Sequence, residues 1–317
     1  MLEALQRPPR QPLVGPGEMD CHFSDMTATF SADVTLAVAQ QKLSERNQWL
    51  PIDGAPDQSL GNLCGCNSTG VLRLGYGAWR DLLLGAQFIN GVGELITVGG
   101  RTVKNVAGYD VTKFMVGQRG TFGRMVTLTT RTYRKPDLAL LARYAPDPAL
   151  VGQMISTALK PTWAMLTRDA LFCGYLGDEP AIAFFEQALA PTKPVEVQRR
   201  SLLDDIVHRQ ELWTVDGRVT FRASVPPANL GQLARGLKVK LWTADAAFGV
   251  AQGVVEGDRN AVKSAVQLAG GTVCFFDGLY GRPIELTVSD GERKLLERLK
   301  AAFDSQQTLN PLPWRNA

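Results

Sequence analysis

The sequence predicts an α+β fold built in two parts, and three observations support this prediction. Residues 82–135 contain runs rich in apolar and β-branched residues, which predict strands. Glycines gather in the segments 52–77 and 99–123, which predicts turns and loops. After Pro136, short apolar runs alternate with helical segments, a pattern typical of helices on one face of an antiparallel sheet.

In the first part, apolar residues at helical spacing predict a helix over 34–50, with Asp33 as its N-cap. Residues 52–77 are predicted to form a loop. Further along, strands are predicted at 82–89, 94–100 and 125–134. The dipeptide Asn90-Gly91 lies between the first two strands and predicts a hairpin turn, because both residues tolerate a positive φ.

In the second part, the pattern of strands and helices runs through two rounds. Helices are predicted near 147–158, 179–190, 227–236 and 257–269. A last helix is predicted after Ser289, which is placed to form a capping box with Glu292. Its apolar stripe consists of Leu295, Leu296, Leu299, Ala302 and Phe303. We therefore expect domain boundaries that give the segments 1–136, 137–288 and 289–317.

The composition is that of a globular protein without metal or membrane-spanning signals. Of 317 residues, 45% are hydrophobic and 21% charged, and the net charge of +3 is too small to indicate nucleic-acid binding. No apolar run reaches the roughly 18 residues of a membrane span, and we recognise no signal peptide. Five cysteines and two histidines favour a reduced, cytoplasmic protein without a zinc site or a Ser-His-Asp triad.

The segment 99–123 combines glycines with positive charge. Residues 101–135 contain eight basic side chains and one acidic one. Main-chain amides that glycine leaves uncovered, set in a positive field, suit a phosphorylated ligand. The pattern matches neither a Walker loop nor the dinucleotide fingerprint of Rossmann folds. The spacing alone is equally compatible with tight turns in a β-rich domain.

A second glycine cluster, "SLGNLCGCNSTG" at 59–70, strengthens the ligand interpretation. It places short polar side chains among its glycines, and these can donate hydrogen bonds to a phosphate or to a heterocycle edge. Ordinary turns would also explain them. Two such segments within one part of the chain favour a shared ligand.

These residues resemble a known family, the flavoproteins of the vanillyl-alcohol-oxidase (PCMH) type. The run "KNVAGYD" at 104–110, followed by "VGQRGTFG" at 116–123, is similar to the family's hallmark. Segment 59–70 is similar to its other FAD loop, and "AAFDSQQTLNPLPW" at 301–314 to its C-terminal tail. Within the family, the chain most resembles the FAD-binding E subunit of bacterial glycolate oxidase.

The resemblance implies a PCMH-type FAD-binding domain, shortened at its N-terminus, and an α+β ferredoxin-like cap domain. It implies non-covalently bound FAD and two sets of cofactor-binding residues. One set consists of Gly61, Asn62, Gly65, Ser68, Thr69 and Gly70. The other set consists of Gly108, Tyr109, Gly117, Gly120, Thr121 and Gly123.

The function that the resemblance implies is oxidation of a small 2-hydroxy acid, with electrons passed through the flavin to partner subunits. The implied partners are a related flavin subunit and an iron-sulfur subunit, by which a cytoplasmic chain could lie at the periphery of the inner membrane. Arg222 is a candidate for clamping the substrate carboxylate, and the sequence identifies no catalytic base. The alternative is a degenerate flavoprotein fold that acts as a non-catalytic assembly subunit without FAD.

Two other patterns receive simpler interpretations. Cys64 and Cys66 lack the further ligands that a metal needs, so we expect two small residues packed beside the cofactor loop. The pair Arg199-Arg200 lacks the aromatic residues that accompany nucleic-acid binding, so we expect a solvated surface or one that meets an acidic partner.

Overall fold

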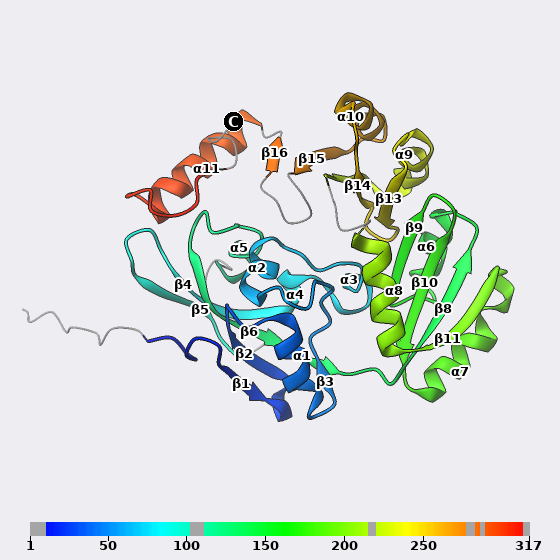
Figure 1. The fold of residues 1–317 in the computed structure, drawn as a ribbon, viewed down its shortest axis with the longest axis horizontal. Coiled ribbons are helices and arrows are strands. Elements are labelled where there is room, and N and C mark those ends of the chain that lie inside the picture. The colour runs from blue at the N-terminus through cyan, green and yellow to red at the C-terminus, as the bar shows by residue number, and fades with distance from the viewer. Residues whose placement is uncertain (1–10, 102–110, 215–219, 277–282, 286–288, 313–317) are drawn as a thin grey trace, which may run out of the picture. The chain divides into compact units, whose positions relative to one another are not determined.

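The structure is a computed structural model, and it describes residues 11–101, 111–214, 220–276, 283–285 and 289–312. It divides the chain into two compact units. Unit 1 comprises Met1–Thr69, Ala78–Lys135 and Asp290–Leu312, and unit 2 comprises Gly70–Gly77, Pro136–Ser289 and Pro313–Ala317. Each unit mixes helices with antiparallel strands, so the predicted α+β class is confirmed (Figure 1).

Unit 1 is built on a five-stranded antiparallel sheet of order β1-β2-β6-β4-β5. These strands are β1 (Met19–His22), β2 (Thr27–Ser31), β4 (Leu83–Ile89), β5 (Leu95–Gly99) and β6 (Arg124–Arg131). A separate ladder joins β3 (Gln48–Trp49) and β7 (Tyr133–Arg134). The helices are α1 (Leu36–Ser44), α2 (Leu60–Gly65), α4 (Trp79–Leu82), α5 (Val111–Phe114) and α11 (Asp290–Phe303), with a 3-10 turn, η1 (Phe23–Asp25).

Helix α1 differs from its prediction at both ends. Its N-cap is Thr35, whose hydroxyl accepts a hydrogen bond from the Val38 amide at 3.4 Å. The predicted cap, Asp33, instead accepts a hydrogen bond from the Gly17 amide at 3.0 Å. The helix ends at Ser44, because the chain turns there and enters strand β3. The apolar spacing of Leu36, Ala39 and Leu43 was interpreted correctly, since all three are buried in the core of unit 1.

The predicted hairpin of β4 and β5 is confirmed, but its turn differs in detail. The positive φ, +83°, belongs to Gly93, while Asn90 and Gly91 have ordinary backbone angles. The side-chain oxygen of Asn90 accepts hydrogen bonds from the amides of Val92 and Glu94, so it fastens the turn from within. Asn90 therefore acts through its amide group and not through a left-handed backbone.

The prediction of a continuous loop over 52–77 is wrong at two places. Residues Leu60–Gly65 form α2, because the Ser59 hydroxyl accepts the Asn62 amide at 3.2 Å and caps the helix. Residues Arg73–Tyr76 form the short helix α3. Glycines generally favour loops over helices, which is why the sequence predicts a loop here, yet Gly61 and Gly65 lie within α2.

Unit 2 is built on a nine-stranded antiparallel sheet of order β11-β8-β10-β9-β13-β14-β12-β15-β16. Its first half contains β8 (Leu138–Tyr144), α6 (Ala149–Met154), β9 (Trp163–Thr167), β10 (Leu171–Gly177), α7 (Glu179–Ala188), η2 (Ala190–Thr192), β11 (Glu196–Ser201) and α8 (Leu202–Thr214). Its second half contains β12 (Phe221–Ser224), η3 (Pro227–Asn229), α9 (Leu230–Gly236), β13 (Leu241–Asp245), β14 (Val250–Val254), α10 (Arg259–Leu268), β15 (Thr272–Phe276) and β16 (Pro283–Glu285).

The two halves of unit 2 repeat one motif. Each runs strand, helix, strand, strand, helix, strand, and each arranges its four strands so that the first and third are central. This is the ferredoxin-like arrangement expected for the cap. We call the halves module 1 (138–201) and module 2 (221–276). They join edge to edge through β9 and β13, where Ala244 pairs with Leu166. The two predicted rounds of strands and helices are thus confirmed.

The two faces of this sheet carry different helices. Helices α6, α7, α9 and α10 supply buried residues to one apolar core, which the sheet completes with Leu166, Phe221 and Trp242. Since side chains alternate along a strand, Trp163 and Arg222 project to the opposite face. Helix α8 lies on that opposite face, where Asp205 accepts a hydrogen bond from the Trp163 indole at 3.2 Å.

The segment Gly70–Gly77 belongs to unit 2, which the sequence did not indicate. Leu74 is part of the apolar core of unit 2. The Arg73 guanidinium donates to the Asp245 carboxylate at 2.7 Å and lies 4.4 Å from the centre of the Phe248 ring. The segment is therefore held by packing, by an ion pair and by a cation–π contact.

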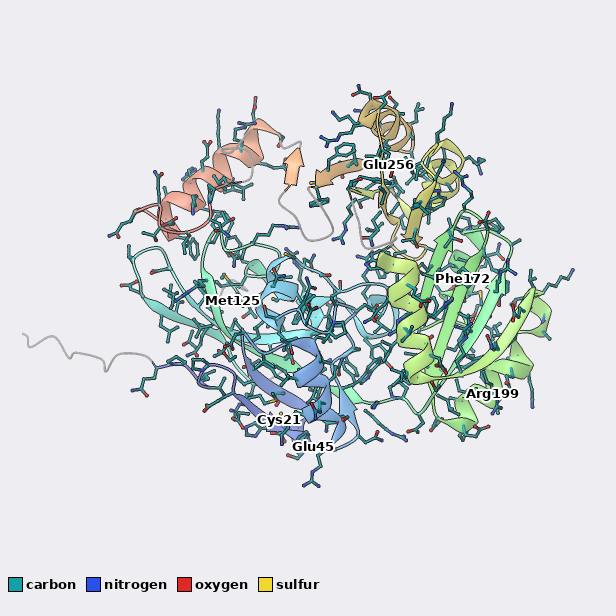
Figure 2. The ribbon with its side chains drawn as sticks, viewed as in Figure 1. Cys21, Glu45, Met125, Phe172, Arg199 and Glu256 are labelled. Atoms are coloured by element: carbon teal, nitrogen blue, oxygen red, sulfur yellow. The ribbon has the colours of Figure 1, made fainter. Side chains whose placement is uncertain are left out.

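Helix α11 and strand β11 each carry a charged or apolar side chain whose setting differs from its prediction. On α11, Leu295 of the predicted apolar stripe is 56% exposed, and the buried residue of the helix is Lys300. On β11, Arg199 forms ion pairs with Glu179 and Glu186 of α7, so its charge is neutralised within the chain (Figure 2). No helix among the described residues combines the length and apolar character needed to cross a membrane.

Candidate functional site

The first glycine loop, residues 59–70, is α2 with the turn that follows it. The chain leaves the helix through hydrogen bonds from the Cys66 amide to Asn62 O and from the Ser68 amide to Leu63 O, both at 2.8 Å. Asn67 has a φ of +51° and Gly70 a φ of +67°. The Trp79 indole donates to Ser68 O at 2.9 Å, and this hydrogen bond holds the end of the turn. This loop is therefore a rigid turn.

The second glycine loop, residues 117–123, is braced from within by the side chain of Gln118. Gln118 is 7% exposed, and its amide group donates to Gly123 O at 2.7 Å and accepts from the Phe122 amide at 2.9 Å. Positive φ angles occur at Gly117 (+85°), Arg119 (+53°) and Gly120 (+76°). Gln118 lies between the left-handed Gly117 and Arg119 and has no positive φ, and such a change of hand between neighbours is the geometry from which an anion-binding nest is built.

The structure brings the two glycine loops together. The Gly117 amide donates to Cys64 O, and the Arg119 amide donates to Gly65 O, both at 3.0 Å. The bonded residues are more than 50 positions apart in the chain, yet the two loops share a two-bond ladder. Backbone groups from both segments therefore lie side by side, as a ligand common to the two loops requires.

The glycines of the loops have different reasons to be glycine. A Cβ on Gly61 would lie 2.7 Å from Ala32 O, and one on Gly123 would lie 2.5 Å from the Phe88 ring. A Cβ on Gly120 would lie 2.7 Å from the Asn310 side chain. These three glycines thus permit close packing inside the protein. Their predicted role in binding the cofactor stays a prediction.

Gly65 and Gly117 are the glycines that leave space beside the shared ladder. A Cβ on Gly65 would meet nothing closer than 4.0 Å, and one on Gly117 would lie 3.4 Å from the Asn67 Cβ atom. Gly65 has no positive φ, so the backbone at this position does not require glycine. Gly65 is itself buried, and the space beside it is the room that a Cβ would take.

The predicted cofactor-binding residues are distributed as follows. Gly61, Asn62, Gly65, Ser68, Thr69 and Gly70 lie in the first loop, and Gly117, Gly120, Thr121 and Gly123 lie in the second. Ser68, Thr69 and Thr121 are buried, while Asn62 and Gly117 are exposed. Gly108 and Tyr109 lie outside the described residues. Gly70 is assigned to unit 2, and the other described residues of both sets belong to unit 1.

The sequence did not reveal that a C-terminal lock holds the second glycine loop. The buried Lys300 ammonium donates to Thr121 O at 2.9 Å and to Asn310 O at 2.8 Å, and it pairs with Asp304 at 2.5 Å. The Asn310 side chain donates to Arg119 O at 2.6 Å. Lysine in an amphipathic helix is ordinarily read as solvated, so no local signal distinguishes Lys300.

The carboxylate of Asp304 completes this lock. It accepts hydrogen bonds from the amides of Thr308 and Leu309, at 2.8 Å and 3.1 Å. Burial by itself would raise the pKa of Asp304, but the hydrogen bonds from Lys300 and from these two amides outweigh it, and the pKa is lowered. Asp304 is therefore held as a carboxylate, and it pairs with the Lys300 side chain beneath the loop.

The other residues that the sequence singled out do not add a reactive centre to this site. Cys64 is buried, and its burial raises the pKa of its thiol to about 12, so it stays protonated at neutral pH. The described residues contain no cluster of three or more His, Cys, Asp and Glu side chains that could hold a metal. Arg222 lies on β12 of unit 2 and donates to the Gln252 side chain at 3.0 Å.

Comparisons with curated proteins show similarity over part of the chain. A D-2-hydroxyglutarate dehydrogenase of Stutzerimonas stutzeri is 31% identical over 126 residues, which is 39% of this chain and 27% of that protein. Glycolate oxidase subunit GlcE of Escherichia coli is 28% identical over 123 residues, 38% of this chain and 35% of that protein.

A mitochondrial D-lactate dehydrogenase (cytochrome) of Arabidopsis thaliana is 27% identical over 121 residues, 38% of this chain and 21% of that protein. The chain thus spans between about a fifth and a third of the length of these relatives. No family model matches the chain.

Comparison with solved structures extends the likeness to nearly the whole fold. An alkyldihydroxyacetonephosphate synthase superposes with a TM-score of 0.66 over 92% of this chain and 65% of that one, at 14% identity. At this identity the match shows the fold alone. The relatives in sequence and the neighbours in structure agree with the glycine-loop motifs: the chain is similar to FAD-binding flavoproteins of the vanillyl-alcohol-oxidase (PCMH) type.

Proposed function

We propose that the chain binds FAD non-covalently at the two glycine loops and acts as a flavin subunit of a 2-hydroxy-acid dehydrogenase of the glycolate-oxidase type. The observation that carries the proposal is the ladder between the loops, Gly117 N to Cys64 O and Arg119 N to Gly65 O. The names of the relatives support it, because a glycolate oxidase subunit, a D-lactate dehydrogenase and a D-2-hydroxyglutarate dehydrogenase all act on 2-hydroxy acids.

The residues present fit the diphosphate of a dinucleotide. Gly65 and Gly117 leave room for it to approach the main chain, because a Cβ at either position would extend into that room. The amides of Gly117 and Arg119 are used in the ladder, and those of Thr121 and Phe122 donate to Gln118, so donors to an anion would come from the remaining amides of the second loop. Side-chain donors would come from Asn62, Ser68, Thr69 and Thr121. We assign Gly108 and Tyr109, which the family resemblance implies, to the same site.

Bound FAD would accept a hydride from the α-carbon of the substrate. The chain would bind and orient the cofactor and set the charge around it. Gln118 and Lys300 hold the second loop from two sides, so the nest is formed before the cofactor arrives. Preorganisation of this kind reduces the entropy lost on binding. We assign to Arg222 the role of binding the substrate carboxylate, for which a guanidinium has matching geometry.

The proposal includes partners that receive the electrons. A related flavin subunit and an iron-sulfur subunit are the partners of this proposal, by analogy with a relative named as a subunit of glycolate oxidase. Partner binding is separable from cofactor binding, so both can be measured on one preparation of the chain.

The first experiment is cofactor analysis of the purified full chain. We expect flavin absorbance or saturable binding of added FAD, followed by turnover of glycolate or D-lactate with partner subunits. A chain that binds no FAD and yet captures partner subunits would overturn the proposal in favour of a non-catalytic assembly subunit.

A matched pair of substitutions locates the site. Gly65→Ala adds a Cβ into the open space beside Arg119, and we expect it to weaken FAD binding about tenfold or more, because it displaces the diphosphate from the backbone. Gly152→Ala is the control, since a Cβ there meets nothing within 4 Å and lies on α6 of unit 2. Equal FAD affinity of the two variants would exclude the first loop from the site.

A further inference from the structure

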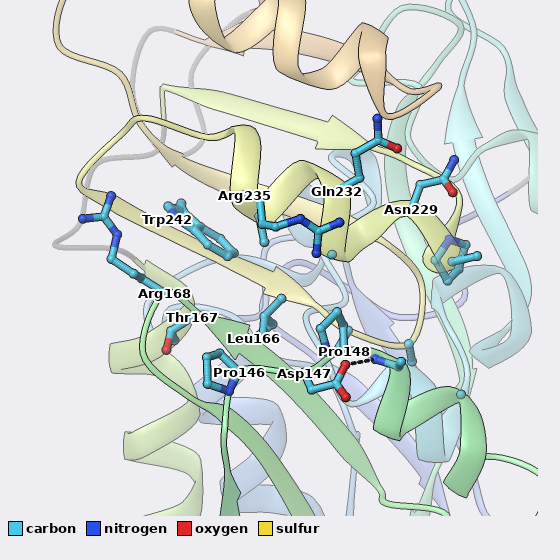
Figure 3. A pocket seen from close by; sticks show the side chains of 18 of the residues that line it. Pro146, Asp147, Pro148, Leu166, Thr167, Arg168, Asn229, Gln232, Arg235 and Trp242 are labelled. Atoms are coloured by element: carbon cyan, nitrogen blue, oxygen red, sulfur yellow. Dashed lines mark hydrogen bonds between the residues drawn. The ribbon is translucent and has the colours of Figure 1, made fainter.

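A cavity lies in unit 2, where the two ferredoxin-like modules meet. It measures about 910 Å³, within the range of small-molecule sites. Its walls come from equivalent parts of the modules: the loop before α6 and α6 itself on one side, and η3 and α9 on the other. The strands β9 and β13 contribute Leu166, Thr167 and Trp242 (Figure 3).

The cavity lies on the face of the sheet that carries α6 and α9. Leu166 and Trp242 belong both to its lining and to the core beneath those helices. Arg222, which we assign to the substrate, alternates with the core residues Phe221 and Ala223 and so projects from the opposite face. The cavity is therefore separate from the residues of the proposed function, and an inference about it does not rest on FAD.

One buried polar group of the cavity is unused. Trp242 is only 6% exposed, and its indole N–H has no hydrogen-bond partner among the described residues. Because this nitrogen has almost no accessible surface, it does not face the open space of the cavity, and Trp242 lines the wall with its ring. Most of the remaining lining is apolar, and it includes Pro146, Pro148, Ile155 and Pro227.

The charges of the lining select the ligand. Arg168 and Arg235 contribute two positive charges and Asp147 one negative charge, which leaves a net charge of +1. Asp147 already accepts a hydrogen bond from the Ala149 amide at 3.0 Å. Arg235 forms no ion pair with any residue that the structure describes. In the view of Figure 3 the Trp242 ring is drawn between the two arginine side chains.

From these features we propose that unit 2 binds an amphipathic monocarboxylate, whose carboxylate meets the arginines and whose apolar body lies against the prolines, Leu166 and the Trp242 ring. A carboxylate accepts from several donors at once, as this set requires. A dianion such as a phosphate ester would carry more charge than the net +1 of the lining balances.

The test is a binding titration of the full chain with octanoate, octanol and octylammonium, which share one apolar body and differ in charge. We expect saturable binding of one octanoate per chain, weaker binding of octanol and no saturable binding of octylammonium. Tryptophan emission should change with octanoate in the wild type, and this change should be reduced in Trp242→Phe.

Matched variants assign the charge. Arg235 is exposed, so Arg235→Gln should fold normally and weaken octanoate binding about fivefold, as expected for a solvated ion pair. Arg80→Gln makes the same change of charge on α4 in unit 1 and should leave the affinity unchanged. The proposal is overturned if octanoate does not saturate, if octanol binds as tightly, or if the two arginine variants behave alike.

Discussion

At the scale of single residues, two buried carboxylates have opposite pKa shifts, and the difference follows from their partners. Burial raises the pKa of Asp245 above 3.8, and the Arg73 ion pair only partly offsets it. At Asp304, burial is outweighed by Lys300 and two amides, so the pKa is lowered from 3.8. Burial favours the neutral acid, whereas hydrogen bonds to the ionised form favour the carboxylate.

The two shifts predict opposite dependences of stability on pH. The low pKa of Asp304 stabilises the fold above pH 3.8, and this contribution is lost as the pH falls through the folded pKa. The raised pKa of Asp245 stabilises the fold at low pH, and this contribution is lost as the pH rises from 3.8 through the folded value.

We therefore expect the stability difference between wild type and Asp304→Asn to shrink as the pH is lowered through and below about 4. As the pH is lowered from 7 to 4, the free energy of unfolding of the wild type should rise relative to that of Asp245→Asn. Urea unfolding at pH 7, 5, 4 and 3.5 measures both. If the two differences change in the same direction, the assignment of causes is wrong.

At the scale of elements, α2 shows how one helix combines two kinds of glycine. Gly61 faces β2 and lets the helix approach it, since the Gly61 amide donates to Ala32 O at 2.8 Å. Gly65 ends the helix beside Arg119, where space remains. Four residues apart, these glycines lie near one another on the helix but have different neighbours.

This contrast predicts different effects on stability. Gly61→Ala forces a Cβ against Ala32, and we expect a loss of about 1–3 kcal/mol. Gly65→Ala meets no such obstacle and should be neutral, or stabilise the chain by up to about 1 kcal/mol, because alanine favours helix. Urea unfolding of the variants without FAD decides the matter. A loss at Gly65 as large as that at Gly61 would show that its space is required by the fold.

At the scale of the whole molecule, each unit has its own apolar core and its own ion pair. Lys300 and Asp304 tie the C-terminal segment to the second glycine loop within unit 1. Arg73 and Asp245 tie the segment Gly70–Gly77 to the sheet of unit 2. The chain passes directly from Thr69 of the first glycine loop into this segment, so the two units are linked close to the proposed cofactor site along the sequence.

Replacing one partner of each pair should destabilise one unit at a time. Arg73→Met leaves the buried Asp245 without its cation, and Lys300→Met does the same to Asp304; each should cost about 3 kcal/mol. Hydrogen exchange should become faster in β13 and β14 for the first variant, and in α11 and the second glycine loop for the second. Faster exchange throughout both units in either variant would contradict this division.

Much of the fold was predictable because its signals are local. Apolar and β-branched runs predict the strands β4, β5 and β6. The spacing of apolar residues predicts the helices α7 and α10. Four strands of the sheet in unit 2, β9, β11, β13 and β16, went unpredicted. Their sequences are short, and β11, with its two arginines, is largely exposed at the sheet edge, so its pattern resembles a loop.

For the proposed site, the sequence by itself determined the class of fold, the two glycine loops and the family, since glycine, periodicity and motif are properties of neighbouring residues. Only the tertiary structure decided which glycines face protein and which face open space, and that Lys300 supports a loop 179 residues away. These depend on contacts between distant segments, and the same local sequence can be solvated or buried according to what the rest of the chain places against it.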